Sequence, residues 1–344
     1  MPVTIRDVAK ASGVHISTVS RTFTAPHLVR EETRARVLAV AERMGYRPDR
    51  AARSLITGRT QNLGLIVADL ANPFFPPLIK AAARQAGTRD YHVFVADTDE
   101  DPAVEEELVR TLAKQVDGIL LCSPRMTNDQ IQRLSQLVPL VVINRRLEGL
   151  ATVVMDVGHG ARLAVEHLTC LGHRDLAMLG GPRRSWTNRE IRRSATAAAR
   201  AAGVKLTLLG PYRPTQESGE RAAGQVAAAG ATAVLAYNDL MAIGLLDGLT
   251  KLGLRVPEDI SIVGVDDIGP SRCTSPKLTT VANPTVAAGR TAVDMLLNLD
   301  DPMATTAQVV LHTTLVVRQS TGRGPHVPAP GVSAHHPSPR TVAS

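Results

Sequence analysis

The chain has 344 residues, of which 44% are hydrophobic and 21% charged, with a net charge of +7, and this balance predicts a soluble protein of two or three domains. No run of about 18 apolar residues occurs, which excludes a membrane-spanning helix of the usual length, and the charged start MPVTIRDVAK argues against a secretion signal. The three cysteines lie far apart without C-x-x-C spacing, so we expect a reduced, cytoplasmic protein with neither a disulfide framework nor a zinc site.

The first predicted module, residues 1–45, is small and basic. Residues 1–60 contain 11 lysines and arginines against five acidic residues, whereas residues 61–320 contain 26 against 27. A basic module joined to a nearly neutral body is typical of proteins that bind nucleic acid through one end. The alternative is a basic surface that is merely solvated.

Three short helices are predicted in this module. The first covers Ile5–Ser12, with Thr4 as its N-cap, and Gly13 follows where a left-handed turn favours glycine. The second covers Ile16–Thr22 and the third covers Glu31–Met44. The apolar residues expected to face the core of the module are Val19, Val37, Leu38, Ala41 and Met44. Two helices joined by a glycine turn predict a helix-turn-helix, whose second helix enters the DNA major groove.

A longer ordered match extends beyond this motif. The stretches TIRDVAKASGVHISTVSRTF and EETRARVLAVAERMGYRPDRAARSL resemble the DNA-binding end of the LacI/GalR family of bacterial transcription regulators. Hydroxyl groups and a guanidinium suit contacts with phosphates and base edges, whereas Ile16 can offer only an apolar contact. The resemblance implies that the partner is double-stranded DNA, and that the residues of this module which contact it are Thr4, His15, Ile16, Ser17, Thr18, Ser20 and Arg21.

Two residues of the module depart from the family pattern. His15 stands where a small hydroxyl residue usually caps the second helix, and Thr24 replaces a usual asparagine. Tolerated surface variation is one interpretation of both changes. A phosphate contact that strengthens on protonation is the other interpretation for His15.

Residues 46–59 are the predicted hinge helix and linker. The stretch YRPDRAARSL resembles the family's hinge helix, which implies that Arg53 and Leu55 also contact DNA, with Leu55 inserted into the minor groove. The small Ala51 and Ala52 would let two hinge helices pack closely in a homodimer. An ordinary linker helix that packs on the next domain is the alternative.

From residue 60 onward, buried strands alternate with helices. Strands such as NLGLIVADL, HVFVADT and GILLCSP are followed by helical stretches, and the same scheme restarts at DLAMLGGP. The predicted fold class is therefore an all-α helix-turn-helix domain followed by an α/β effector domain of two doubly wound parallel-sheet lobes. This body resembles the periplasmic-binding-protein-like effector domain of the same family.

The resemblance implies that the chain crosses between the lobes near residues 158, 282 and 309. The first lobe would contain residues 60–158 and 282–308, and the second would contain residues 159–281 and 309–320. Residues 321–344 are rich in proline, glycine and serine and are predicted to be disordered.

Polar and aromatic residues follow several predicted strands, where the loops of both lobes would face a common cleft. Strand-terminal Asn and Asp suit a ligand rich in hydroxyl groups, and adjacent phenylalanines suit a wall against a sugar ring. One of these phenylalanines could instead fill the lobe core. The residues expected to contact a small-molecule effector are Asn72, Phe74, Phe75, Ser123, Arg125, Asn144, Arg145, Asp156, Trp186, Asn188, Asn238 and Asp266. Asp239 is expected to act mainly as a helix N-cap, and Asp267 to be structural.

Two further departures concern the effector. Ile191 occupies the position of a sugar-contacting arginine that is frequent in the family, and Gln216 replaces a frequent aromatic residue. An effector that is larger, less polar or different from a neutral sugar is therefore an open alternative.

The function predicted from the sequence is a DNA-binding transcriptional regulator, a repressor of carbohydrate-use genes that responds to a sugar-like effector. It would bind a pseudo-palindromic operator as a homodimer, in the cytoplasm at the nucleoid, with no cofactor, no metal and no membrane partner. A solute-binding protein of the same fold and an enzyme on a doubly wound scaffold are the alternatives. The helix-turn-helix speaks against the first, and no catalytic motif supports the second.

Overall fold

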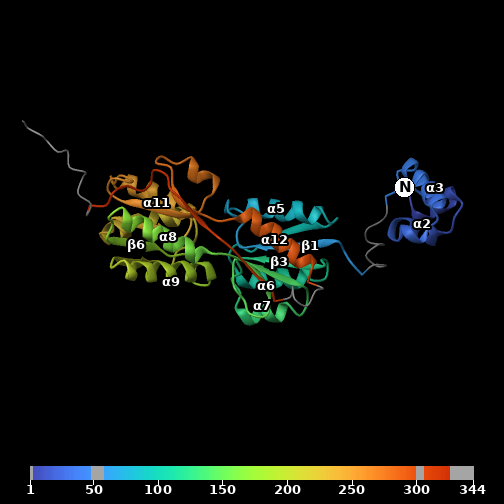
Figure 1. Ribbon diagram of the computed structural model, residues 1–344, viewed down its shortest axis with the longest axis horizontal. Coiled ribbons are helices and arrows are strands. Elements are labelled where there is room, and N and C mark those ends of the chain that lie inside the picture. The colour runs from blue at the N-terminus through green and yellow to red at the C-terminus, as the bar shows by residue number, and fades with distance from the viewer. Residues whose placement is uncertain (1–2, 48–57, 300–305, 326–344) are drawn as a thin grey trace, which may run out of the picture.

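The computed structural model describes residues 3–47, 58–299 and 306–325, which form a small helical unit and a larger body of two lobes (Figure 1). The predicted hinge contacts Arg53 and Leu55 and the final residues 326–344 lie outside these ranges. Across the described ranges, the helices are too short or too polar to cross a lipid bilayer.

The helical unit contains α1 (Ile5–Ser12), α2 (Ile16–Thr24), the 3-10 helix η1 (Pro26–Leu28) and α3 (Glu31–Arg43). Its core is built around Val8, Val19 and Val37. The prediction that Leu38 faces inward is wrong, because this side chain is 42% exposed and Val40 is buried instead. Val37 and Val40 are three residues apart and share one helix face, whereas Leu38 is turned about 100° away from Val37.

The two lobes have the same strand order, with one edge strand of each contributed by the C-terminal part of the chain. The first lobe contains β1 (Asn62–Val67), α5 (Phe75–Gly87), β2 (His92–Asp97), α6 (Pro102–Leu112), β3 (Gly118–Cys122), α7 (Asn128–Leu134), β4 (Leu140–Ile143), β5 (Ala151–Met155), α12 (Thr285–Leu297) and β11 (Gln308–Leu311). The second contains α8 (Val157–Cys170), β6 (Asp175–Leu179), α9 (Trp186–Ala201), β7 (Lys205–Leu209), α10 (Gln216–Ala228), β8 (Ala233–Ala236), α11 (Asp239–Lys251), β9 (Ser261–Asp266), η2 (Gly269–Arg272), β10 (Thr279–Ala282) and β12 (Thr314–Val316).

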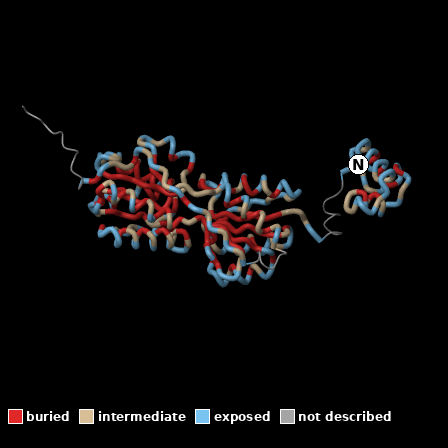
Figure 2. The backbone as a smooth tube through the Cα atoms, in the orientation of Figure 1, coloured by how far each residue is buried: buried red, intermediate tan, exposed pale blue. Residues whose placement is uncertain are grey.

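The sheet orders are β11-β5-β4-β3-β1-β2 and β12-β10-β9-β8-β6-β7. Neighbouring strands are parallel except for the β10–β12 pair. Helices cover both faces of each sheet: α5 and α12 lie opposite α6 and α7, and α8 and α9 lie opposite α10 and α11. Figure 2 shows the resulting layers, with buried strands between helices that are exposed on their outer sides. Burial on both faces explains why the central strands are almost continuously apolar.

Three segments connect the lobes within the described residues, after β5, after β10 and after β11 (Figure 1). The third crossing was predicted near residue 309, but residues 308–311 pair with β5 in the first sheet, so the crossing follows Leu311. The apolar run of β11 continues past the predicted boundary. The predicted start of the tail is also too early, because the amide of Gly322 still binds Ser261 Oγ at 3.0 Å.

Candidate functional site

The turn between α1 and α2 depends on Gly13. Its φ of +66° is left-handed, and the following amide of Val14 binds the carbonyl oxygen of Ala9 at 3.1 Å. At the other end of α1, the amide and hydroxyl of Thr4 both bind the Asp7 carboxylate, at 2.9 and 2.7 Å. These contacts fix both ends of α1, so that α2 starts in a defined direction from it.

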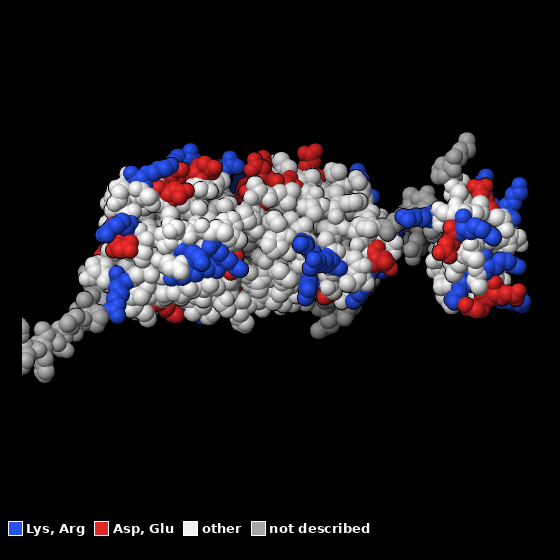
Figure 3. Space-filling view, turned by 90° about the horizontal axis from the view of Figure 1, so that it is seen from above, with Lys and Arg blue, Asp and Glu red and all other residues white. Residues whose placement is uncertain are grey.

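The start of α2 presents the residues that were predicted to read DNA. Ile16 is 39% exposed, Ser17 and Arg21 are exposed, and Thr18 and Ser20 are half-buried. An exposed apolar side chain beside hydroxyls and an arginine matches the chemistry of a DNA major groove. Figure 3 shows further basic side chains spread over the visible face of this unit.

His15 is the N-cap of α2. Its Nδ1 accepts a hydrogen bond from the amide of Ser17 at 3.3 Å and lies 2.9 Å from the Ser17 hydroxyl. The imidazole therefore caps α2 in place of the small hydroxyl residue that is usual at this position. Thr24, the other departure, binds the carbonyl oxygen of Ser20 through its hydroxyl at 3.0 Å and extends α2 two residues beyond its predicted end.

A second candidate site lies between the lobes, where the carboxyl ends of the strands face each other. It encloses a cavity of about 30 Å³. The residues that line this cavity are Asn72, Phe74, Phe75, Glu100, Ser123, Arg125, Asn144, Thr187, Pro214, Tyr237, Asn238 and Asp266. Most of the residues predicted to contact an effector are thus brought together here, and Glu100, Thr187, Pro214 and Tyr237 join them.

Several of the lining residues have a strained backbone. Glu100, Ser123, Asn144 and Asp266 have φ values of +66°, +53°, +63° and +122°, although none is glycine. Such residues cost roughly 1–3 kcal/mol each and gather at ligand sites. The buried Oδ1 of Asn144 has no hydrogen-bond partner among the described residues, while its Nδ2 donates to Ser123 Oγ at 3.2 Å. Strain and an unpaired polar atom at the same strand ends are typical of a binding site.

The apolar wall of the cavity comes from both lobes. Phe74 and Phe75 pack edge to face with ring centroids 5.0 Å apart, and both are buried. From the second lobe, the hydroxyl of Tyr237 lies 3.1 Å from Ser185 Oγ, and burial raises the pKa of this phenol above its usual value. The two phenylalanines therefore fill the lobe core and line the cavity at once.

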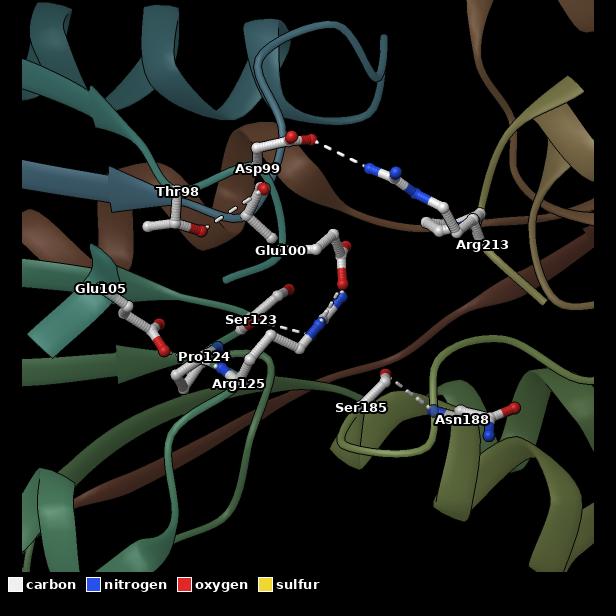
Figure 4. A network of polar contacts seen from close by, with 12 residues as sticks. Thr98, Asp99, Glu100, Glu105, Ser123, Pro124, Arg125, Ser185, Asn188 and Arg213 are labelled. Atoms are coloured by element: carbon white, nitrogen blue, oxygen red, sulfur yellow. Dashed lines mark hydrogen bonds and ion pairs between the residues drawn. The ribbon is translucent and has the colours of Figure 1, made fainter. Parts of the chain in front are cut away.

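The charged centre of the cavity is Arg125 (Figure 4). Its guanidinium binds both carboxylate oxygens of Glu100, and Nη1 donates to the carbonyl oxygen of Ser123 at 2.6 Å. Burial by itself favours the neutral guanidine, but the acidic neighbours Tyr237 and Glu100 together raise the pKa of Arg125 above its usual value. The carboxylate of Glu105 accepts the backbone amides of Arg125 and Met126, both at 2.9 Å.

Four predicted effector residues lie away from this cavity. The guanidinium of Arg145 turns back onto its own lobe and donates to the carbonyl oxygen of Met126 at 2.6 Å. Asp156 caps α8 by accepting the amide of His159 at 3.0 Å, and Asn188 Oδ1 accepts the amide of Gly181 at 2.8 Å. Trp186 packs half-buried against the core at the start of α9. Arg145, Asp156 and Asn188 thus bind backbone groups outside the cavity, although Arg145 Nε has no partner among the described residues.

Other sequence interpretations are also revised. Asn238, not Asp239, is the N-cap of α11, because its Oδ1 accepts the amide of Met241 at 3.0 Å. Ile191 is fully buried in the second lobe, and Gln216 is the first residue of α10 and binds Asp247 at 3.0 Å. Neither departure from the family pattern faces the cavity.

The comparisons with known proteins agree with this architecture. Residues 4–49 match the bacterial regulatory proteins of the lacI family, and residues 165–321 match a periplasmic binding protein-like domain. The HTH-type transcriptional repressor PurR of Haemophilus influenzae (strain PittEE) is 31% identical over 331 residues, covering 92% of this chain and 98% of the relative.

Two solved structures extend the likeness. The lac repressor dimer bound to operator and the anti-inducer ONPF has a TM-score of 0.83 and 28% identity, covering 94% of this chain and 100% of that chain. The complex of the transcriptional regulator CelR with cellobiose has a TM-score of 0.70 and 29% identity, covering 92% and 99%.

Proposed function

Because the chain belongs to the LacI family of bacterial regulatory proteins, we propose that it is a transcriptional repressor whose operator binding is controlled by a small molecule in the cleft between the lobes. The observation that carries this proposal is the exposed start of α2, where Ile16, Ser17 and Arg21 face solvent together. Regulation of this kind belongs in the cytoplasm, at the nucleoid, and involves no catalysis.

The proposed effector is a sugar-like molecule from a carbohydrate-use pathway. Its support is the polar lining of the cavity, above all the unpaired Oδ1 of Asn144, and the phenylalanine wall beside it. The likeness to the CelR–cellobiose complex also supports this class. A cavity of about 30 Å³ is much smaller than a usual ligand pocket of roughly 300–1,000 Å³, so the lobes must separate or side chains must move on binding.

The proposed assembly is a homodimer that binds a pseudo-palindromic operator. Its support within the chain is the edge strand β2, where Phe94 and Val95 are 44% and 39% exposed. Leu70, also exposed, lies beside the end of this strand, because its amide binds Asp97 at 3.2 Å. An apolar edge strand of this kind is unfavourable in a monomer.

The test is DNA binding by the full-length protein. An operator is first selected from a library of inverted repeats, and its affinity is then compared with that of random DNA by fluorescence anisotropy. We expect Arg21→Ala to weaken binding to the selected site by roughly tenfold or more, while Arg43→Ala, a matched arginine on α3, weakens binding to both DNAs alike. A protein that selects no sequence would contradict the proposal.

A further inference from the structure

A buried arginine fills the centre of the cleft. The side chain of Arg125 is 5% exposed, and Glu100 binds two of its guanidinium nitrogen atoms (Figure 4). The cavity that remains, of about 30 Å³, has room for on the order of one water molecule. Any larger ligand at this point must therefore displace one of the protein's own groups.

Of the two partners, Glu100 is the one that can leave. Arg125 is held at its backbone by the buried Glu105, which accepts the amides of residues 125 and 126. Glu100 follows the edge strand β2, is 15% exposed, and has a φ of +66° directly after Asp99 at +46°. Consecutive left-handed residues other than glycine persist only while other contacts hold them. Release of the Glu100 side chain removes one such contact.

The surroundings of the pair favour an anion. A hollow of about 330 Å³ adjoins the pair, and the second lobe lines it with Arg183, Arg184 and Arg213. Glu100 is the one acidic residue in the lining of this hollow, as far as the described chain shows. Arg189 of the second lobe adds to the positive charge of this region: the pKa of Arg145 is lowered first by burial and then by the charge of Arg189, although Glu105 opposes this effect.

We propose that the effector carries an oxyanion, a carboxylate or a phosphate, which replaces the Glu100 carboxylate on Arg125. The inference rests on the proposed function, because it names the chemistry of the ligand of the same cleft. A planar guanidinium binds either group through two parallel hydrogen bonds. Exchange of one anion for another keeps the buried charge of Arg125 paired before and after binding, which avoids the cost of an isolated buried charge.

The same exchange reaches the other lobe. Asp99, next to Glu100, binds Arg213 of the second lobe at 3.2 Å (Figure 4). When the ligand releases Glu100, the loop that holds this contact between the lobes is released with it. The ligand thus has a different affinity for the two loop states, which is the requirement for control of a conformational equilibrium.

The test uses the one tryptophan of the chain as a reporter. Trp186 begins α9, and the next residue, Thr187, lines the cavity. Full-length protein is titrated with inorganic phosphate and, separately, with acetate, at constant ionic strength, while tryptophan fluorescence is followed. The variant is Glu100→Gln, and the matched control is Glu220→Gln, which removes a carboxylate that binds Lys251 on the surface of the second lobe.

Glu100→Gln should bind at least one oxyanion with an apparent Kd lowered by roughly tenfold or more, because the internal competitor for a charged hydrogen-bond site has been removed. The control Glu220→Gln should bind the oxyanion with the apparent Kd of the wild type. The double variant Glu100→Gln/Arg125→Gln should lose the gain in affinity. A gain with phosphate alone assigns a phosphate group, and a gain with acetate alone assigns a carboxylate. No gain with either, or a gain that survives the loss of Arg125, overturns the proposal.

Circular dichroism checks that each variant is folded. If Glu100→Gln does not fold, Glu100→Asp takes its place, because the shorter acid cannot reach both guanidinium nitrogens and should give a smaller gain of the same sign. A folded Glu100→Asp without any gain would then decide against the proposal. DNA binding is measured on the same preparations, so a failure of operator binding is seen separately from a failure of anion exchange.

Discussion

In the first lobe the buried carboxylate of Glu105 lies near two arginines, whereas in the second lobe the buried carboxylate of Asp239 has only hydroxyl and amide partners. Burial raises the pKa of Glu105, but backbone amides and then the charges of Arg125 and Arg145 oppose this effect. Burial raises the pKa of Asp239 to about 7, although the carboxylate accepts hydrogen bonds from Ser271, Thr280 and Ile268.

This difference shows that a shared strand order does not determine the electrostatics of a lobe. The electrostatics depends instead on a few residues in the segments that follow the strands. In the first lobe, Arg125 supplies a permanent charge to the cleft, and the acids around it are its partners. In the second lobe, Asp239 connects α11 to η2 and β10, and its charge depends on pH near neutrality. The first arrangement places a charged group at the cleft, and the second joins elements within the lobe.

The largest expected effect comes from the closest helix contact. A Cβ atom on Gly244 in α11 would lie 1.8 Å from the carbonyl oxygen of Gln216, whereas one on Gly289 in α12 would lie 2.5 Å from that of Leu78. Gly244→Ala should therefore lower the free energy of unfolding by roughly 3 kcal/mol or more, because α10 and α11 must move apart. Gly289→Ala should lower it by less, because its Cβ atom would overlap less with the neighbouring helix. Urea denaturation of the full-length protein measures both.

Gly224→Ala is the matched control, because a Cβ on this residue of α10 would meet open space. Alanine favours a helix over glycine by about 1 kcal/mol, so this variant should be as stable as the wild type or more so. Equal stability of Gly244→Ala and Gly224→Ala would show that the second lobe tolerates wider helix spacing than its packing indicates.

The next effect concerns pH. The folded-state pKa of Asp239, about 7, lies above its usual 3.8, so the neutral carboxyl stabilises the folded state. This contribution is complete below about pH 4 and is lost as the pH rises through about 7. Between pH 5 and 8, the free energy of unfolding of the wild type should therefore fall by about 2 kcal/mol relative to Asp239→Asn.

Two further variants sharpen the pH experiment. Asp259→Asn removes an exposed carboxylate whose pKa is lowered by Arg255, so it should leave the profile between pH 5 and 8 unchanged. Glu105→Gln should remove less pH dependence than Asp239→Asn, because the nearby arginines oppose the effect of burial on Glu105. Chemical denaturation gives the free energy of unfolding at each pH. If this free energy depends on pH in the same way in the wild type and in Asp239→Asn, the proposed difference between the buried carboxylates of the two lobes is refuted.

The smallest effect is expected for the ion pair between the lobes. Arg213 and Asp99 are both well exposed, with 68% and 83% of their side-chain surface accessible. Arg213→Ala should change the free energy of unfolding by less than about 1 kcal/mol, because solvent screens exposed pairs. Lys251→Ala, which breaks a pair within the second lobe, is the control. A loss of several kcal/mol for Arg213→Ala alone would mean that this contact holds the lobes together.

The fold was predictable because its signals are local and regular. Capped amphipathic helices around Gly13 and buried strands such as NLGLIV indicate their own structure, and repetition of strand and helix indicates parallel sheets. The comparisons confirm the predicted fold class. The place of the cavity also followed from a general rule, because Ser123 and Asn144 come directly after strands whose carboxyl ends meet, and Asn72 lies in the loop after β1.

The individual contacts were less predictable. Arg125 and Arg145 follow neighbouring strands, yet one guanidinium lines the cavity and the other binds the carbonyl oxygens of its own lobe. The sequence around each arginine does not reveal which way its side chain turns. Tyr237 was missed although it follows β8 directly, beside the predicted Asn238, so its place at a strand end could have indicated it. Glu100 was missed because its role depends on an ion pair with a residue 25 positions away. Long-range partners of this kind have no local signal.

The late return of the chain to the first lobe has a consequence for synthesis on the ribosome. The helix-turn-helix unit has all of its elements once α3 ends at Arg43, but the sheet of the first lobe gains its edge strand only when Leu311 has been added. Domains generally fold as they emerge, starting from the N-terminus. A growing chain therefore carries a complete helix-turn-helix unit through most of its synthesis. The sheets of both lobes lack an edge strand until β11 and β12, the last elements, have been made.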